Sequence, residues 1–140
     1  MRHGGNVWEG QPADWLDFSA NLRPEGTPAW VMDTMRAALS QACYYPDRAM
    51  RAARAGLALY LGVDESCMLL TAGGAAAIDL TLGVRRGAVH VQQPTFGEYA
   101  ERAKAHGRRM AANQAIQADD TVVVCNPNNP TGTLLSPNDV

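Results

Sequence analysis

The sequence predicts an α/β fold with a largely parallel sheet, and three observations carry this prediction. From residue 68 onward, short apolar runs alternate with segments of helical periodicity, and turns rich in glycine or proline separate them. The run TVVVC at 121–125 is unbroken and β-branched, which is typical of a strand covered on both faces of its sheet. Neighbouring parallel strands need a crossover connection, and the alternation supplies a helix for it.

Composition predicts a globular protein. The 140 residues are 46% hydrophobic and 19% charged, which is enough apolar material for the core of one ordinary domain. No run approaches the roughly 18 apolar residues of a membrane span, and the first residues lack the apolar stretch of a secretory signal. The net charge is −2, and the arginines alternate with acidic residues. These features predict a cytoplasmic protein that binds neither membrane nor nucleic acid.

Two residue types limit the chemistry. The cysteines Cys43, Cys67 and Cys125 are widely separated and form no CxxC pair, so neither a disulfide framework nor a metal site is expected. Lys104 is the only lysine of the chain. Because Glu101 precedes it by three residues on a predicted helix, a solvated ion pair is favoured over a buried, reactive amine.

The first 26 residues are predicted to be an extended arm, because glycines and prolines interrupt them throughout. Residues 27–140 are predicted to form a domain that starts with two helices. Thr27-Pro28 is a helix-start signal, and apolar residues recur at helical spacing over about 28–42. A second, alanine-rich helix is predicted over about 48–61, with Gly62 as its cap.

Strands and helices alternate in the rest of the chain. The predicted strands are 68–71, 88–92 and 121–125, with a weaker one at 109–112. The predicted helices are 75–84 and 98–106, the second stopped by Gly107. Ser136-Pro137 signals a further helix start four residues before the end. We therefore expect the chain to be the N-terminal part of a longer α/β protein.

Three loops of the predicted sheet carry candidate binding residues. They are AGGAAA at 72–77, QPTFGEY at 93–99 and NPNNPTG at 126–132, and each follows a predicted strand. Loops at the carboxyl ends of neighbouring parallel strands converge on one crevice, which is where ligands bind in such folds. We therefore expect one pocket to collect all three loops.

Each loop has a functional and a structural interpretation. Gly73-Gly74-Ala75 at a helix start offers free backbone N–H groups to an anion such as a phosphate, or it is simply a tight turn. Phe96 either stacks on a planar ligand or fills the core. Asn128 and Asn129 either point amide donors into the crevice or only form turns. The first loop matches no dinucleotide or nucleoside-triphosphate motif.

These residues resemble a known family. Tyr45-Pro-Asp47, Pro94-Thr-Phe-Gly-Glu-Tyr99 and Asn126-Pro-Asn-Asn-Pro-Thr-Gly132 are similar, in order and spacing, to motifs of fold-type I pyridoxal-phosphate enzymes of the histidinol-phosphate aminotransferase group. His3-Gly-Gly-Asn6 and Asp17-Phe-Ser-Ala-Asn-Leu-Arg-Pro24 narrow the resemblance to the threonine-phosphate decarboxylases of cobalamin biosynthesis. The resemblance implies an N-terminal arm, 1–26, and part of a three-layer α/β/α large domain, 27–140, truncated.

The resemblance also implies a role for particular residues. The amides of Gly74 and Ala75 would hold the phosphate of pyridoxal 5'-phosphate, Phe96 would stack on its ring, and Asn129 would hydrogen-bond its phenolic oxygen. Tyr45 would reach across a homodimer interface to the phosphate in the partner's site. Three residues of the arm would lie near the phosphate of a small phosphorylated amino acid: His3, Gly4 and Asn21.

The implied activity is the decarboxylation of L-threonine O-3-phosphate to aminopropanol phosphate. A histidinol-phosphate-type aminotransferase and a non-catalytic truncated product are the alternatives. In the family, four residues follow the PNNPTG loop: the aspartate at the pyridine nitrogen, the Schiff-base lysine, a phosphate-binding arginine and a carboxylate-binding arginine. None of them has a counterpart in this chain. No catalytic residue is therefore assigned, and the 140-residue chain is expected to be inactive alone.

Overall fold

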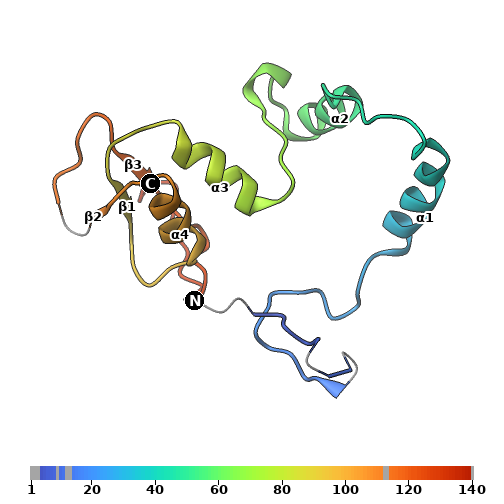
Figure 1. Cartoon of the computed structure of the whole chain (residues 1–140), viewed down its shortest axis with the longest axis horizontal. Helices are drawn as coiled ribbons and strands as arrows, with labels where there is room; N and C mark the ends of the chain where they lie inside the picture. The colour runs from blue at the N-terminus through green and yellow to red at the C-terminus, as the bar shows by residue number, and fades with distance from the viewer. Residues whose placement is uncertain (1–3, 9, 12–13, 112–113, 140) are drawn as a thin grey trace. The chain divides into compact units, whose positions relative to one another are not determined.

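The computed structural model describes residues 4–8, 10–11, 14–111 and 114–139. The chain divides into two compact units, Met1–Arg51 and Ala52–Val140. Figure 1 labels the helices and strands along the chain.

The first unit consists of the arm and one helix. The described residues of the arm form no α-helix and no strand, but the arm folds back on itself, because the amide of Gly5 donates to Ser19 Oγ at 2.7 Å. Gly4 packs so closely on the Ser19 backbone that a Cβ on Gly4 would overlap the Ser19 carbonyl oxygen. Helix α1 spans Ala29–Ala38 and continues as the 3-10 turn η2, Leu39–Gln41, which confirms the first predicted helix.

The second unit contains nearly all of α2, Arg51–Leu61, then the short 3-10 helix η3, Glu65–Cys67. Gly62 ends α2 with a φ of 67°, in the left-handed conformation that favours glycine. The predicted strand at 68–71 is wrong. In the described part of the chain no strand lies beside this segment, and Leu69 is 73% exposed, so its backbone forms no ladder.

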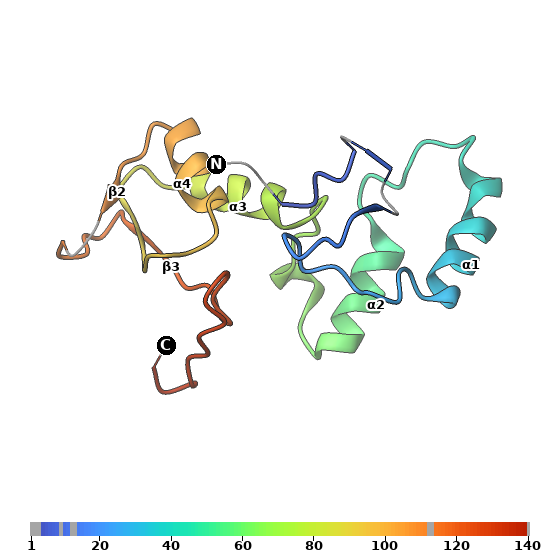
Figure 2. The same ribbon diagram turned by 90° about the horizontal axis from the view of Figure 1, so that it is seen from below.

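The sheet has the predicted parallel arrangement. Strands β1, Val89–Val91, β2, Met110–Ala111, and β3, Thr121–Val123, are ordered β2-β1-β3, and both neighbouring pairs are parallel. Helices α3, Gly74–Gly83, and α4, Glu98–Ala105, lie side by side in Figures 1 and 2. The buried core between these helices and the sheet consists of Leu82, Val89 and Ala103, with Ile78 and Val123 packed against it.

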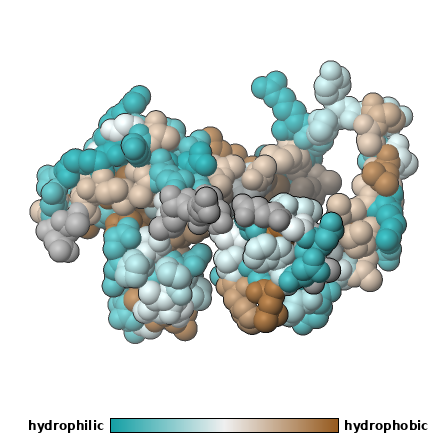
Figure 3. Space-filling model, turned by 60° about the horizontal axis from the view of Figure 1, so that its bottom comes forward, coloured by the Kyte–Doolittle hydropathy of each residue, from teal (hydrophilic) through white to brown (hydrophobic). Residues whose placement is uncertain are grey.

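Only one face of this sheet is covered by helices in the described chain. Val122 and Val124 of the TVVVC run are 52% and 47% exposed, so the expectation that this strand is covered on both faces is wrong here. Alternate residues of a strand point to opposite faces, and Val123 is the residue that packs against the core. Figure 3 shows brown, apolar side chains at the surface among teal, hydrophilic ones.

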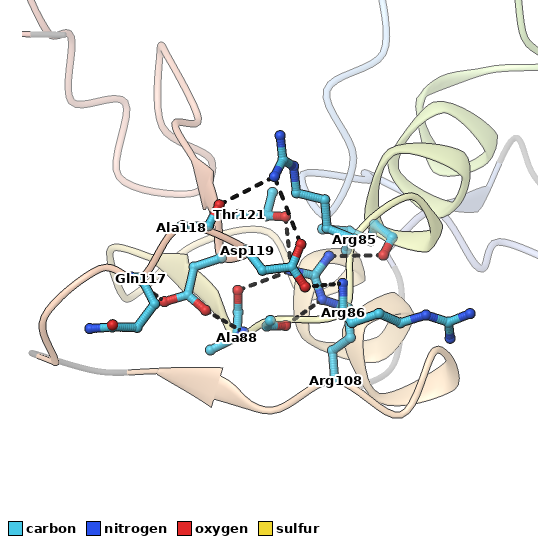
Figure 4. A network of polar contacts seen from close by, with 11 residues as sticks. Arg85, Arg86, Ala88, Arg108, Gln117, Ala118, Asp119 and Thr121 are labelled. Atoms are coloured by element: carbon cyan, nitrogen blue, oxygen red, sulfur yellow. Dashed lines mark hydrogen bonds and ion pairs between the residues drawn. The ribbon is translucent and has the colours of Figure 1, made fainter.

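A buried arginine ties the helices to the amino ends of the strands (Figure 4). Arg108 is only 6% exposed. Its Nε donates to Gly87 O at 2.7 Å and its Nη1 to Leu82 O at 2.9 Å, while its Nη2 donates to Ala88 O at 3.0 Å and to Thr121 Oγ1 at 2.8 Å. These neutral oxygens together satisfy most of the guanidinium donors, which is what allows the group to be buried.

Two aspartates before β3 complete the same network. Asp120 accepts hydrogen bonds from the Ala88 amide at 2.6 Å and the Gln117 amide at 2.9 Å, and its Oδ2 lies 2.8 Å from His90 Nε2. Asp119 accepts from the amide of Arg86 at 3.1 Å. The segment that leads into β1 is thereby fixed to the segment that leads into β3.

Candidate functional site

Two of the three predicted loops meet beyond the carboxyl ends of the strands. The loop 92–97 follows β1 and the loop 124–133 follows β3, and these strands are parallel neighbours. The side chain of Asn128 joins the loops: its Oδ1 accepts from Thr95 Oγ1 at 2.8 Å, and its Nδ2 donates to Pro94 O at 2.9 Å. The structure therefore confirms the predicted convergence for these two loops.

The loop after β3 is also closed on itself. The backbone N–H of Asn128 donates to Thr133 O at 2.8 Å, and the backbone carbonyl of Asn128 accepts from the Gly132 N–H at 2.7 Å. Gly132 has a φ of 71°. At the base, the Asn126 side chain donates from Nδ2 to Leu135 O at 3.1 Å and accepts at Oδ1 from Leu135 N at 2.9 Å. Asn126 and Asn128 of NPNNPTG thus form turns, which is the structural one of the two interpretations given for this loop.

Asn129 is the exception among these asparagines. It is exposed, and in the described part of the chain its side-chain amide has no hydrogen-bond partner. Its backbone amide is one of the causes that lower the pKa of the Cys125 thiol. The Asn129 side chain is therefore available to a ligand, whereas the Asn128 side chain is occupied.

Cys125, at the base of the loop that follows β3, and Tyr99 of α4 form a polar contact. The hydrogen bond from Tyr99 is the main cause that lowers the pKa of the Cys125 thiol, followed by the Asn129 amide. Burial, together with the hydrogen bond to Cys125, raises the pKa of Tyr99 to about 12. Tyr99 thus stays a neutral phenol, a donor near neutral pH, and this contact adds to the link between the loops.

Phe96 is half-buried, so it is neither a fully buried core residue nor a free surface ring. Its ring meets that of Tyr99 edge to face, with centroids 5.9 Å apart and planes at 87°. In this geometry the edge of one ring contacts the face of the other, which holds the Phe96 ring in one orientation.

The glycine loop begins α3 as predicted. Gly73 is its N-cap, with a φ of 84°, and a Cβ at either Gly73 or Gly74 would meet no atom within 4 Å. The first amides of any helix lack intrahelical partners, and the helix dipole favours an anion there. The open space and the donors at Gly74 and Ala75 therefore fit a phosphate, although the segment before them is not a strand.

The remaining predicted residues belong to the first unit. Gly4 packs on the backbone of Ser19, and Ser19 precedes Asn21 by two residues in the sequence. Tyr45 is fully exposed. His3 lies outside the described residues. The assignment of these four residues to a substrate or a partner's site stays a prediction.

A cleft of about 770 Å³ runs along the uncovered face of the sheet up to the two joined loops. Its walls include His90, Val122 and Val124 from the strands and Thr95 and Asn128 from the loops. Phe96, Asn129 and Gly74 do not line it. The predicted binding residues therefore lie on other sides of the loops than this cleft.

Metal-ligating side chains do not gather within the described residues. In 4–8, 10–11, 14–111 and 114–139 no group of three or more His, Cys, Asp or Glu side chains is placed to hold a metal ion. Within the same ranges no helix has the length and apolarity needed to cross a membrane.

No protein-family model matches the chain. The chain is 34% identical to a threonine-phosphate decarboxylase from a Sinorhizobium species, an alignment that covers 96% of this chain and 43% of that protein. It is 33% identical to histidinol-phosphate aminotransferase 1 from Thiobacillus denitrificans, over 91% of this chain and 38% of that protein. The chain thus spans about two fifths of the length of these curated relatives.

The fold comparison agrees with these relatives. The crystal structure of L-threonine-O-3-phosphate decarboxylase from Porphyromonas gingivalis superposes with a TM-score of 0.69 at 23% identity, covering 80% of this chain and 39% of that chain. The predicted α/β class is therefore confirmed: the parallel three-stranded unit matches part of the fold of a known enzyme.

Proposed function

Since the chain is a distant homologue of the threonine-phosphate decarboxylases and histidinol-phosphate aminotransferases of the fold-type I pyridoxal-phosphate family, we propose that it carries the cofactor-binding loops of such an enzyme, with L-threonine O-3-phosphate as substrate. The observation that supports this most is that the two adjacent asparagines of NPNNPTG, Asn128 and Asn129, differ in their contacts. Asn128 is consumed in joining the loops, while the neighbouring Asn129 keeps a free amide beside the half-buried Phe96 loop.

The residues of the second unit suit the parts of pyridoxal phosphate. The backbone amides of Gly74 and Ala75 would hold the phosphate. They lie in the first turn of α3, at the positive end of its dipole, and the space beside Gly74 is open. Phe96 would cover the ring, since Tyr99 already fixes its orientation. Asn129 would donate its side-chain N–H to the phenolic oxygen. When bound, pyridoxal phosphate supplies an electron sink for bond cleavage at the α-carbon of an amino acid.

The residues of the first unit would provide for the substrate. His3, Gly4 and Asn21 would bind the substrate's phosphate, and Tyr45 would act across a homodimer. An orientation that sets the carboxylate bond perpendicular to the ring favours loss of carbon dioxide over loss of the α-proton. Decarboxylation is preferred because the 34% identity to a threonine-phosphate decarboxylase extends over almost the whole chain, arm included.

The test of the cofactor site uses the two phenylalanines of the chain. Pyridoxal phosphate is titrated into the purified chain and its absorbance and fluorescence are followed. We expect Phe96→Ala to weaken binding by roughly 1–3 kcal/mol, from lost apolar contact and stacking. Phe18→Ala, in the exposed arm, is the matched control and should leave cofactor affinity unchanged. Unchanged affinity in Phe96→Ala, with lower thermal stability, would show instead that Phe96 only fills the core.

The aminotransferase is the second candidate, favoured by the 33% identity to a histidinol-phosphate aminotransferase. Joining this chain to the remaining part of the Sinorhizobium relative, with that relative as control, distinguishes the two. We expect the chimera to release carbon dioxide from L-threonine O-3-phosphate. Formation of a keto acid from histidinol phosphate plus an amino acceptor, without carbon dioxide release, would favour the aminotransferase.

A further inference from the structure

The side-chain amide of Asn128 is fully used within the protein. Its Oδ1 accepts from Thr95 Oγ1 at 2.8 Å, and the two hydrogens of Nδ2 go to Pro94 O at 2.9 Å and Thr131 Oγ1 at 2.8 Å. An amide group has two donor hydrogens, and both are engaged here. Asn128 therefore has no donor left for a ligand, although it stands next to the residue proposed to bind one.

We propose that Asn128 is a positioning residue that sets the distance between the two cofactor-binding loops, so that one side chain fixes the places of both Phe96 and Asn129. This inference rests on the proposed function. Thr95 and Phe96 are adjacent in one loop, and Asn128 and Asn129 are adjacent in the other. A displacement at the Thr95–Asn128 bond is therefore transmitted across a single peptide unit on each side, and peptide units are rigid.

The sheet alone does not fix this distance. The β1–β3 ladder ends at the pair Val91 and Val123, so both loops extend beyond the last backbone pairing. Thr95 is 7% exposed, and the bond it makes with Asn128 is thus shielded from competing water. This shielded bond and the Pro94 contact join the two loops past the end of the ladder, in addition to the contact between Tyr99 and Cys125.

The chemistry of the contact requires an amide. An aspartate at 128 would keep an acceptor for Thr95 but would lose both donors and bring a carboxylate against Pro94 O. An alanine would leave the Thr95 hydroxyl and the Pro94 carbonyl without this partner. The neighbouring Asn126 is a natural control, because its side chain bonds only the backbone of Leu135 and so closes its own loop without touching the other.

The first experiment needs no cofactor. Amide hydrogen exchange and two-dimensional NMR shifts are recorded for the full chain and for Asn128→Ala and Asn126→Ala. We expect Asn128→Ala to speed exchange of the Tyr99 amide, which closes the Phe96 turn, roughly tenfold, because losing about 1–1.5 kcal/mol of local hydrogen bonding corresponds to this factor. Asn126→Ala should disturb only residues 126–135. Unchanged shifts and exchange at 95–99 in Asn128→Ala would overturn the proposal.

The second experiment measures the dissociation constant of pyridoxal phosphate for Thr95→Val, Thr95→Ser, Asn128→Ala and the double variant Thr95→Val with Asn128→Ala. We expect Thr95→Val and Asn128→Ala each to raise the constant several-fold, the double variant to be no weaker than Asn128→Ala, and Thr95→Ser, which keeps the hydroxyl, to match the wild type. Independent, multiplicative losses would overturn the positioning role.

The two experiments separate the two proposals. If the wild-type chain binds no pyridoxal phosphate, the proposed function fails, and the exchange measurement alone decides whether Asn128 positions the loops. If the wild type binds and Asn128→Ala binds equally well with its loops displaced, the positioning role fails while the proposed function stands.

Discussion

At the scale of single residues, the polar side chains divide by whether their donors and acceptors are already paired inside the protein. The bonding groups of the Asn128 side chain, and four of the five N–H groups of Arg108, are paired with backbone and hydroxyl oxygens, so these residues serve structure. Asn129 keeps its amide free in the described chain, so it can serve a ligand. From the residues alone Asn128 and Asn129 are equal candidates for a donor, and the family resemblance implies Asn129. The contacts show that the Asn128 side chain is the occupied one.

Arg108 should be a large single contributor to the stability of the second unit. Arg108→Met removes the donors to Gly87 O, Leu82 O and Thr121 Oγ1 and leaves these groups buried without that partner. We expect a loss of about 2–4 kcal/mol in the free energy of unfolding, measured by urea denaturation. Arg85→Met is the control: its guanidinium is exposed and lies 3.8 Å from Asp119, so the loss should stay within about 0.5 kcal/mol. Equal losses in the two variants would contradict the assignment.

Asp120 should make stability depend on acid pH. The Gln117 amide and the His90 side chain, in that order, lower the pKa of Asp120 from 3.8 to about 2. A carboxyl whose pKa falls on folding stabilises fully above its unfolded value, and this stabilisation is lost as the pH drops from about 4 toward 2. We expect Asp120→Asn to be less stable at neutral pH and to show a shallower fall over this window in thermal unfolding. If the stability of Asp120→Asn fell as steeply between about pH 4 and pH 2 as that of the wild type, this role would be refuted.

At the scale of elements, local signals were sufficient where the chain determines its own conformation. Helices α3 and α4 and strands β1 and β3 lie where periodicity and glycine placed them, within a few residues. The segment 68–71 failed because an apolar run becomes a strand only beside a partner, and partners are a non-local property. The loop contacts at Asn128 could not be predicted for the same reason, since Thr95 is 33 residues away.

Two glycines of the second unit should respond oppositely to alanine. A Cβ at Gly87 would lie 2.5 Å from Asp119 C and from Asp120 Oδ1, both in the segment that leads into β3. We expect Gly87→Ala to cost about 1–3 kcal/mol, since backbone must move to accept it. Gly56 lies inside α2, and a Cβ there would meet no atom within 4 Å, so Gly56→Ala should stabilise by about 0.5–1 kcal/mol. Urea denaturation of both variants measures the difference, and a stable Gly87→Ala would show that the two segments are not in contact.

At the scale of the whole molecule, the position of Lys104 limits what this chain can do. Lys104 is exposed and lies near the carboxyl end of α4, about 9 Å along the helix from Glu98, where the Phe96 loop joins it. An exposed amine at the far end of a helix is not held at a cofactor bound by the loops.

We therefore expect no specific imine in this chain. Pyridoxal phosphate is added, reduced with borohydride, and the modified peptides are mapped by mass spectrometry. Labelling should be substoichiometric and shared between Lys104 and the terminal amine, and L-threonine O-3-phosphate should release no carbon dioxide. Stoichiometric labelling of Lys104 together with carbon dioxide release would show that the chain is a complete enzyme.

The strand order has a consequence for how the second unit assembles. The central strand, β1, is the first of the three along the chain, and its partners arrive later: Val89 pairs with Met110 on one side and with Thr121 on the other. No hairpin can start this sheet, so each pairing must close a loop of more than about twenty residues against chain entropy. During synthesis, β1 leaves the ribosome unpaired and waits for the residues up to Val123. Its unpaired N–H and C=O groups are then open to chaperones and to neighbouring nascent chains, so we expect the rate of elongation over residues 92–123 to affect the yield of folded chain.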